Sequence, residues 1–133
     1  MGLGDRWKRW VLYFAGLWNV TGGVNALADP SAHFAGLYNS SLALEDPIQA
    51  FFFRATWINV IAWGIGYVLA AHWSQARLPI LIAGAAGKLA YFGACWALYS
   101  SGGGRTILFA VGMLDVVFAA LFVYIVWSRR EAA

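Results

Sequence analysis

The sequence predicts an all-α integral membrane protein, a four-helix bundle in which residues 1–133 form one domain. Two observations carry this prediction. Apolar residues make up 62% of the chain and charged residues only 11%, whereas soluble domains are about 25% charged. The apolar residues also gather in four stretches of about 19–24 residues, each long enough for a helix to cross a hydrocarbon core of about 30 Å. These stretches are residues 10–28, 48–71, 79–98 and 106–127.

The first stretch has features of a secretory signal peptide. Cations precede it, and an Ala-x-Ala tripeptide closes it at residues 26–28. However, Asn19, Thr21 and Asn25 lie within the stretch, and these polar residues fit the interior of a bundle better than the core of a signal peptide. We therefore expect the first helix to be retained, with cleavage as the alternative.

The connectors differ in length. The connector at residues 73–78 is short, so the second and third helices should be antiparallel neighbours. The glycine-rich residues 100–104 predict a flexible turn before the fourth helix. The connector at residues 29–47 begins and ends with Asp-Pro, a turn signal, but is too apolar between them for a solvated loop. We expect a short helix there, either in the outer membrane interface or as a lid over the bundle.

Cations near the stretches predict the orientation of the chain. Those expected on one side are Arg6, Lys8, Arg9, Arg77, Arg129 and Arg130. The connectors on the other side contain one cation, Arg105, and three acids, Asp29, Glu45 and Asp46. By the positive-inside rule, we expect a multi-pass protein of the plasma membrane with both termini in the cytoplasm.

Small residues recur at three- and four-residue steps in the third stretch. They are Ala83, Gly87, Ala90, Ala94 and Ala97. Small side chains allow another helix backbone to approach closely in a membrane. This face is expected either to pack within the chain or to form a homodimer or a contact in a larger membrane complex.

Polar residues lie near the middle of every stretch. Asn19, Asn59, Lys88 and Asp115 should form one layer near the membrane midplane. A charged side chain at that depth costs at least about 2.5–3.5 kcal/mol on insertion scales, so it needs a partner, water or a function. Lys88 and Asp115 lie at similar depth in helices expected to be neighbours, and we predict that they form an ion pair.

Arg54 lies nearer the outer end of the second stretch, and Tyr91 lies one turn outward from Lys88, so both are expected at one level. Arg54 and Lys88 are two cations, whereas Asp115 is the one acid within the four stretches. This excess of positive charge is balanced if acids of the connectors fold inward. Otherwise it leaves a positive site for an anionic or carbonyl-bearing headgroup, with aromatic residues such as Trp57 holding an apolar tail.

Several functional classes are excluded or disfavoured. Cations at the ends of apolar stretches are typical of membrane orientation, and without a basic stripe interleaved with aromatic residues we expect no nucleic-acid partner. Cys95 is the single cysteine, so a cysteine-rich metal site is excluded. His33 and His72 fall at opposite ends of the predicted bundle, which disfavours a bis-histidine haem. We expect no metal and no other cofactor.

Three functions remain open. The first is binding of a lipophilic or amphipathic molecule, for transport, sensing or proton-assisted conversion, with Asp115 as candidate acid or base. The second is an accessory subunit or assembly factor of a larger membrane complex, and the third is a membrane enzyme of lipid or isoprenoid metabolism. A purely structural role for the polar layer is the simpler alternative. The candidate ligand-binding residues are Asn19, Arg54, Trp57, Asn59, Lys88, Tyr91 and Asp115.

Overall fold

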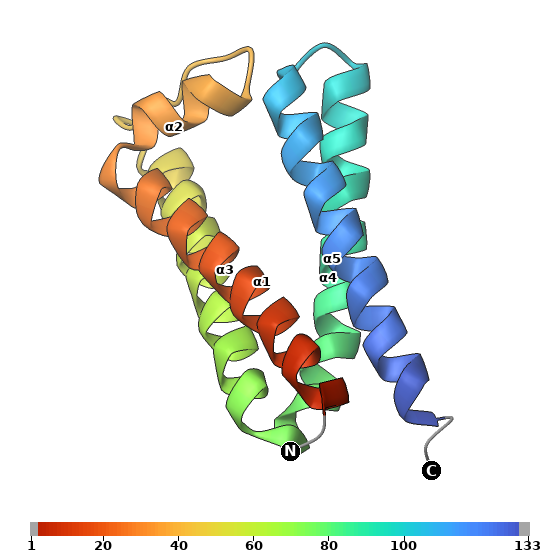
Figure 1. Cartoon of the computed structure of the whole chain (residues 1–133). Coiled ribbons are helices and arrows are strands. Elements are labelled where there is room, and N and C mark those ends of the chain that lie inside the picture. The colour runs from red at the N-terminus through yellow and green to blue at the C-terminus, as the bar shows by residue number, and fades with distance from the viewer. Residues whose placement is uncertain (1–2, 131–133) are drawn as a thin grey trace.

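The structure, a computed structural model, describes residues 3–130, which fold into five α-helices (Figure 1). The helices are α1 (Leu3–Ala28), α2 (Pro30–Leu37), α3 (Pro47–His72), α4 (Ser74–Ser100) and α5 (Thr106–Arg130). Among these residues there is no β-strand, only an isolated bridge between Tyr38 and Gly104. The predicted all-α class is confirmed, and the short helix expected between the first two long helices is α2.

Within the described residues, three helices are long and apolar enough to cross a membrane. They are α3, α4 and α5, the last over Thr106–Ser128. α1 has a similar length of 26 residues, but polar residues such as Asn19, Thr21 and Asn25 interrupt its apolar sequence. The chain is therefore a membrane protein with three spans supported by length and composition.

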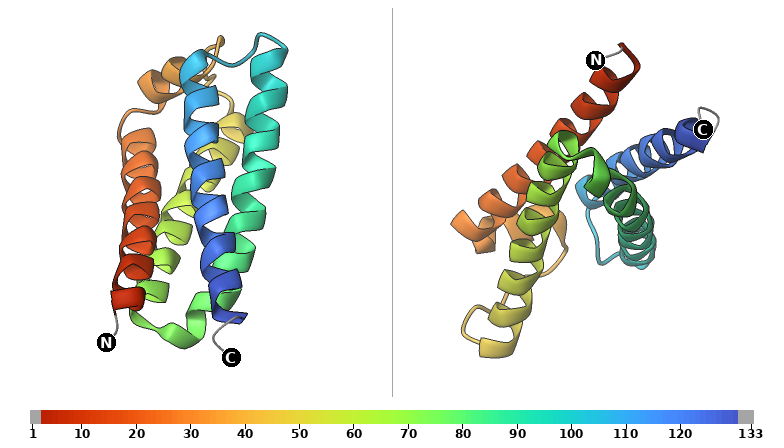
Figure 2. Two further views of the ribbon diagram at one scale, coloured as in Figure 1. Left: turned by 45° about the vertical axis from the view of Figure 1, so that its right-hand side comes forward. Right: turned by 90° about the horizontal axis from the view of Figure 1, so that it is seen from below.

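The four long helices form two antiparallel pairs, α1 with α3 and α4 with α5 (Figures 1 and 2). The pairs lie close together near the α3–α4 connection and diverge toward the end that carries α2. The predicted neighbours α4 and α5 do pack along each other, but α3 packs mainly on α1 and contacts α4 less. Connector length alone predicted the second and third helices as neighbours and gave no indication of the α1–α3 pair.

Glycines explain the close packing of α1 on α3. A Cβ added to Gly64 would lie 2.8 Å from the backbone oxygen of Gly16, and a Cβ on Gly16 would lie 2.7 Å from that of Gly64. Gly23 is equally constrained by Ile61 of α3. Without side chains at these positions the two backbones touch, which maximises dispersion contacts between helices in a membrane.

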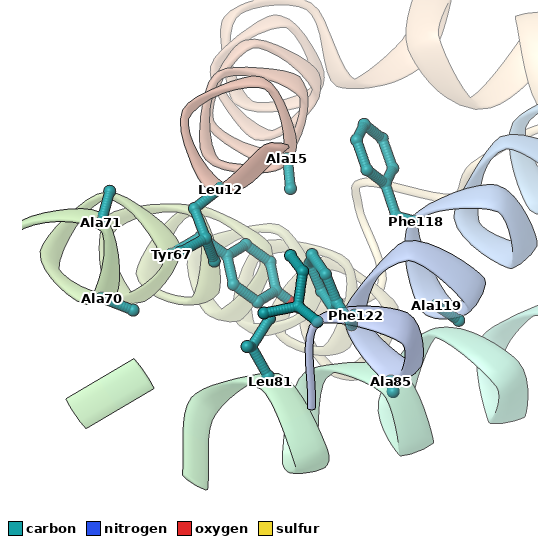
Figure 3. Packing of buried hydrophobic residues seen from close by; sticks show 11 residues of the cluster. Leu12, Ala15, Tyr67, Ala70, Ala71, Leu81, Ala85, Phe118, Ala119 and Phe122 are labelled. Carbon is teal, nitrogen blue, oxygen red and sulfur yellow. The ribbon is translucent and has the colours of Figure 1, made fainter. Parts of the chain in front are cut away.

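The main apolar core joins all four long helices near the end where the pairs converge (Figure 3). The rings of Tyr67 and Phe122 lie 5.1 Å apart between their centroids, and Tyr67 fits against Gly84 of α4. The remaining core residues are Leu12, Ala15, Ala70, Ala71, Leu81, Ala85, Phe118, Ala119 and Ile125.

Charged side chains cap three helix ends, which belong to α2 and α3. The Asp29 carboxylate accepts a hydrogen bond from the Ala32 amide at the start of α2, and Asp46 accepts one from Ile48 at the start of α3. Each precedes a proline that occupies the first turn, so both Asp-Pro signals mark helix starts. Arg77, expected in a connector, is instead buried in α4 and donates hydrogen bonds to the α3 carbonyls of Ala70 and Ala71.

The diverging ends of the two pairs are joined by a clasp between residues 37–39 and 102–105. The Asn39 amide donates to the Gly103 carbonyl at 2.8 Å, and its side chain donates to the Gly102 carbonyl at 2.8 Å. The Arg105 amide donates to the Leu37 carbonyl at 2.9 Å. Gly102 has a φ of +82°, which favours glycine. The turn predicted to be flexible is thus hydrogen-bonded to the segment that follows α2.

Candidate functional site

Three of the predicted site residues meet between the helix pairs. The Nζ atom of Lys88 on α4 lies 2.5 Å from Asp115 Oδ1 on α5 and donates a second hydrogen bond to Asn19 Oδ1 on α1 at 3.3 Å. The predicted ion pair is therefore present, and Asn19 extends it to the other helix pair. We call Asn19, Lys88 and Asp115 the buried triad after its two buried charged residues, whereas Asn19 is half-buried.

The surroundings of the buried triad are apolar. Lys88 is 5% exposed and Asp115 is 7% exposed. The Lys88 ammonium also lies 5.3 Å from the centre of the Phe118 ring and 5.7 Å from that of Tyr67, which adds cation–π attraction. The triad carries no net charge when both ionisable groups are charged, and two of the three Lys88 N–H donors have an acceptor. Its three side chains come from α1, α4 and α5, and the charges of Lys88 and Asp115 balance each other.

Asn59 does not belong to this layer. It is exposed and donates a hydrogen bond to the Ala55 carbonyl of its own helix at 2.9 Å. From its position in the second stretch, Asn59 was predicted to lie at the same depth in the membrane as Asn19. However, the contact between Gly16 and Gly64 sets the rotation of α3, and that rotation turns Asn59 outward.

Trp57 and Tyr91 lie in a second apolar cluster between the buried triad and the clasp. Its buried members are Leu37, Cys95 and Leu108, and the side chains packed on them are Tyr38, Trp57, Tyr91 and Val111. The ring of His33 meets Trp57 edge-on with centroids 4.5 Å apart. Burial lowers the pKa of His33 from its usual value, so neutral imidazole is favoured there. Trp57 and Tyr91 therefore help to close the diverging end of the molecule.

Arg54 lies apart from all of these residues. Its side chain is exposed and lines a groove of about 440 Å³ near the start of α3. The other lining residues are Leu44, Glu45, Pro47, Ala50, Phe51, Ala55 and Ile58. Tyr91 packs in the second cluster, whereas Arg54 is exposed in this groove. We call this depression the Arg54 groove.

The acids of the connector between α1 and α3 do not fold inward to balance the cations. Asp29 and Asp46 are helix caps, as described above. Glu45 is exposed and lines the Arg54 groove. Within residues 3–130, no ion pair joins Glu45 to Arg54, so the groove presents one acidic and one basic side chain that do not neutralise each other by contact.

A second groove, of about 380 Å³, lies on α4 and α5. Its lining residues are Leu89, Val116, Ala119, Ala120, Val123, Tyr124 and Trp127. None of them is charged, so this groove has no side chain that would form an ion pair with a charged headgroup. The sequence analysis did not identify it, since its residues are ordinary apolar residues of two different stretches.

Metal ligation finds no support in the part of the chain that the structure describes, which contains no group of three or more His, Cys, Asp or Glu side chains suited to an ion. Comparisons of the chain with known protein families, with curated proteins and with solved structures found no match. Any functional conclusion therefore rests on the chemistry of the buried triad and of the Arg54 groove.

Proposed function

We propose that this chain is a four-span membrane protein that binds an amphipathic ligand, with the ligand's anionic headgroup held at the Arg54 groove. In this proposal α1 provides the fourth crossing, both termini are cytoplasmic, and the groove opens at the outer side of the plasma membrane. The start of α1 and the end of α5 lie at the same end of the molecule, as an even number of crossings requires (Figure 1).

The observation that carries the proposal is an exposed guanidinium on an apolar helix face. On the same part of α3, Ile48 is 65% exposed, Phe51 64% and Ile58 57%. In a bilayer such a face contacts lipid. Arg54 follows Pro47 by about two helical turns, or roughly 10 Å at 1.5 Å per residue, so its long side chain reaches back toward the headgroups.

The chemistry of arginine defines the ligand class. A guanidinium presents a planar fork of donors that matches the two oxygens of a phosphate or carboxylate. The neighbouring walls, from Leu44, Phe51, Ala55 and Ile58, are apolar and suit a hydrocarbon tail. Together they fit an amphipathic molecule whose anionic group lies at the outer interface and whose tail extends inward.

The buried triad serves this function as a scaffold. Lys88 and Asp115 neutralise each other and, with Asn19, hold the two helix pairs together. Since Lys88 engages Asp115, the geometry favours a binding protein over an enzyme that uses Asp115 as acid or base.

Lipid retention tests the proposal. Wild-type protein is extracted in mild detergent, and the bound molecules are identified by native mass spectrometry. Arg54→Gln should lose the retained amphiphile, and Arg54→Lys should retain less than the wild type because it keeps the charge but loses the fork. Arg6→Gln is the matched control, since it removes an exposed cation from the opposite end and should leave retention unchanged. Equal retention by all variants, or no amphiphile in the wild type, overturns the proposal.

An accessory-subunit role is the second candidate, and the small-residue face of α4 favours it. The residues Ala83, Gly87, Ala90, Ala94 and Ala97 are all exposed, and a Cβ on Gly87 would meet no atom within 4 Å. In the described chain, therefore, this face does not serve intramolecular packing. Ala90→Leu should then release a co-purifying protein while leaving thermal stability unchanged. A sample without any protein partner argues against this role.

A further inference from the structure

We infer that the Arg54 groove selects a zwitterionic phospholipid with a primary ammonium group, with Arg54 binding the phosphate and Glu45 binding the ammonium. This inference rests on the proposed function and names its ligand class. The starting point is the pair of opposite charges in one groove, which make no ion pair with each other within residues 3–130.

Glu45 is the acid available for this role. The nearby Asp46 carboxylate already accepts hydrogen bonds from the backbone amides of Ile48 and Gln49 and from the Gln49 side chain. Asp29 is held in the same way by the Ala32 amide. Glu45 lies next to Asp46 in the connector, but its side chain is exposed on the groove. A carboxylate placed beside an anion-binding arginine weakens the binding of a simple anion, so its presence calls for a cationic group on the same ligand.

The order of groups along the groove matches the order of groups in such a lipid. Glu45 precedes α3 and lies outermost, Arg54 lies about two turns into the helix, and Ile58 lies a further turn inward. In the lipid, the ammonium is attached to the outer side of the phosphate, and the acyl chains extend inward from the glycerol. Glu45 therefore lies at the level of the ammonium, Arg54 at that of the phosphate, and the apolar wall at that of the acyl chains.

A primary ammonium fits better than a quaternary one. Three N–H donors allow charge-assisted hydrogen bonds to a carboxylate. A quaternary ammonium has no N–H and is typically held by a cage of several aromatic rings. The groove contains one aromatic side chain, Phe51. Phosphatidylethanolamine is thus the expected ligand, in preference to phosphatidylcholine and to the amine-free phosphatidylglycerol.

The test compares these three lipids with identical acyl chains, each titrated into the delipidated full-length protein and quantified by native mass spectrometry. The wild type should prefer phosphatidylethanolamine to phosphatidylglycerol. Glu45→Gln should reduce that preference by up to about fivefold, the range expected for an exposed ion pair. Glu45→Asp keeps the charge and should retain part of the preference. The melting temperature of each variant verifies folding.

The outcomes separate the two proposals. If the wild type binds the three lipids equally, or if Glu45→Gln leaves the preference unchanged, the inference about the ammonium is wrong while the headgroup role of Arg54 stands. If Arg54→Gln binds each lipid as well as the wild type does, both proposals fail.

Discussion

Lys88 and Asp115 lie 27 residues apart in the sequence and form a buried ion pair between α4 and α5. The hydrogen bond from Lys88 to Asn19 extends this pair to α1, which contacts α4 and α5 much less than it contacts α3. The buried triad therefore adds a polar link to the other contacts between the two helix pairs, which are the apolar core, the second cluster, the Arg77 hydrogen bonds and the clasp.

Removing either charge of the ion pair should destabilise the protein. Lys88→Met and Asp115→Leu each leave one buried charge without its partner, which typically costs about 3–5 kcal/mol. Replacing both with apolar residues removes both desolvation penalties, so the double variant should recover much of the stability. Thermal unfolding of the four proteins in one detergent measures the coupling. Losses that simply add in the double variant would show that the two residues do not interact energetically.

The two asparagines predicted at similar depth should differ. Asn19→Leu removes the hydrogen bond that joins Lys88 to α1 and should cost about 0.6 kcal/mol, the average for interhelical hydrogen bonds in membranes, and at most about 1.7 kcal/mol. Asn59→Leu is the matched control, because Asn59 is exposed and bonds to its own helix. It should leave the melting temperature nearly unchanged. Equal destabilisation by both substitutions would contradict the outward orientation of Asn59.

Gly64 should tolerate no side chain. Alanine there would place its Cβ 2.8 Å from the Gly16 oxygen and force α1 away from α3. Overpacking of this kind typically costs about 1–3 kcal/mol. Gly66→Ala, two residues along the same helix, meets no atom within 4 Å and should be neutral or slightly stabilising. Melting temperatures of the two variants test the α1–α3 contact. If Gly64→Ala is as stable as Gly66→Ala, that contact is wrong.

The four-span topology predicts which parts of the chain share a compartment. Reporters fused after Ala133 and inserted within residues 101–104 should report opposite sides, with the C-terminal reporter in the cytoplasm. A further reporter in residues 40–43 should agree with the one in residues 101–104, because the clasp holds these segments together. Agreement of the C-terminal reporter with either connector reporter would contradict the four-span topology.

Sequence patterns predicted the helices well because the length and hydropathy of a stretch depend on residues that are neighbours in the sequence. The Asp-Pro signals before α2 and α3 mark their starts, and charge at matching depth predicted the pairing of Lys88 with Asp115. Depth along a helix does not define which face a residue occupies. Asn59 was therefore placed in one layer with Asn19, although the rotation of α3 turns Asn59 outward.

Contacts between distant segments were less accessible to sequence reasoning. Arg77 is buried because the chain folds back between α3 and α4, so that the Arg77 guanidinium reaches the last carbonyls of α3. The presence of an arginine just after a helix end was the available signal, but it was assigned to membrane orientation. The clasp depends mainly on backbone hydrogen bonds, which leave little trace in residue type apart from Asn39 and the glycines of the turn.

The location of a bound lipid tests the central claim most directly. A phospholipid with a photoreactive acyl chain is added to the wild type, crosslinked by light, and mapped by peptide mass spectrometry. The account predicts adducts concentrated on the apolar walls of the Arg54 groove, from Leu44 to Ile58, and their loss in Arg54→Gln. Adducts spread evenly over the exposed helix faces, or concentrated on the groove of α4 and α5 and unaffected by Arg54→Gln, would contradict it.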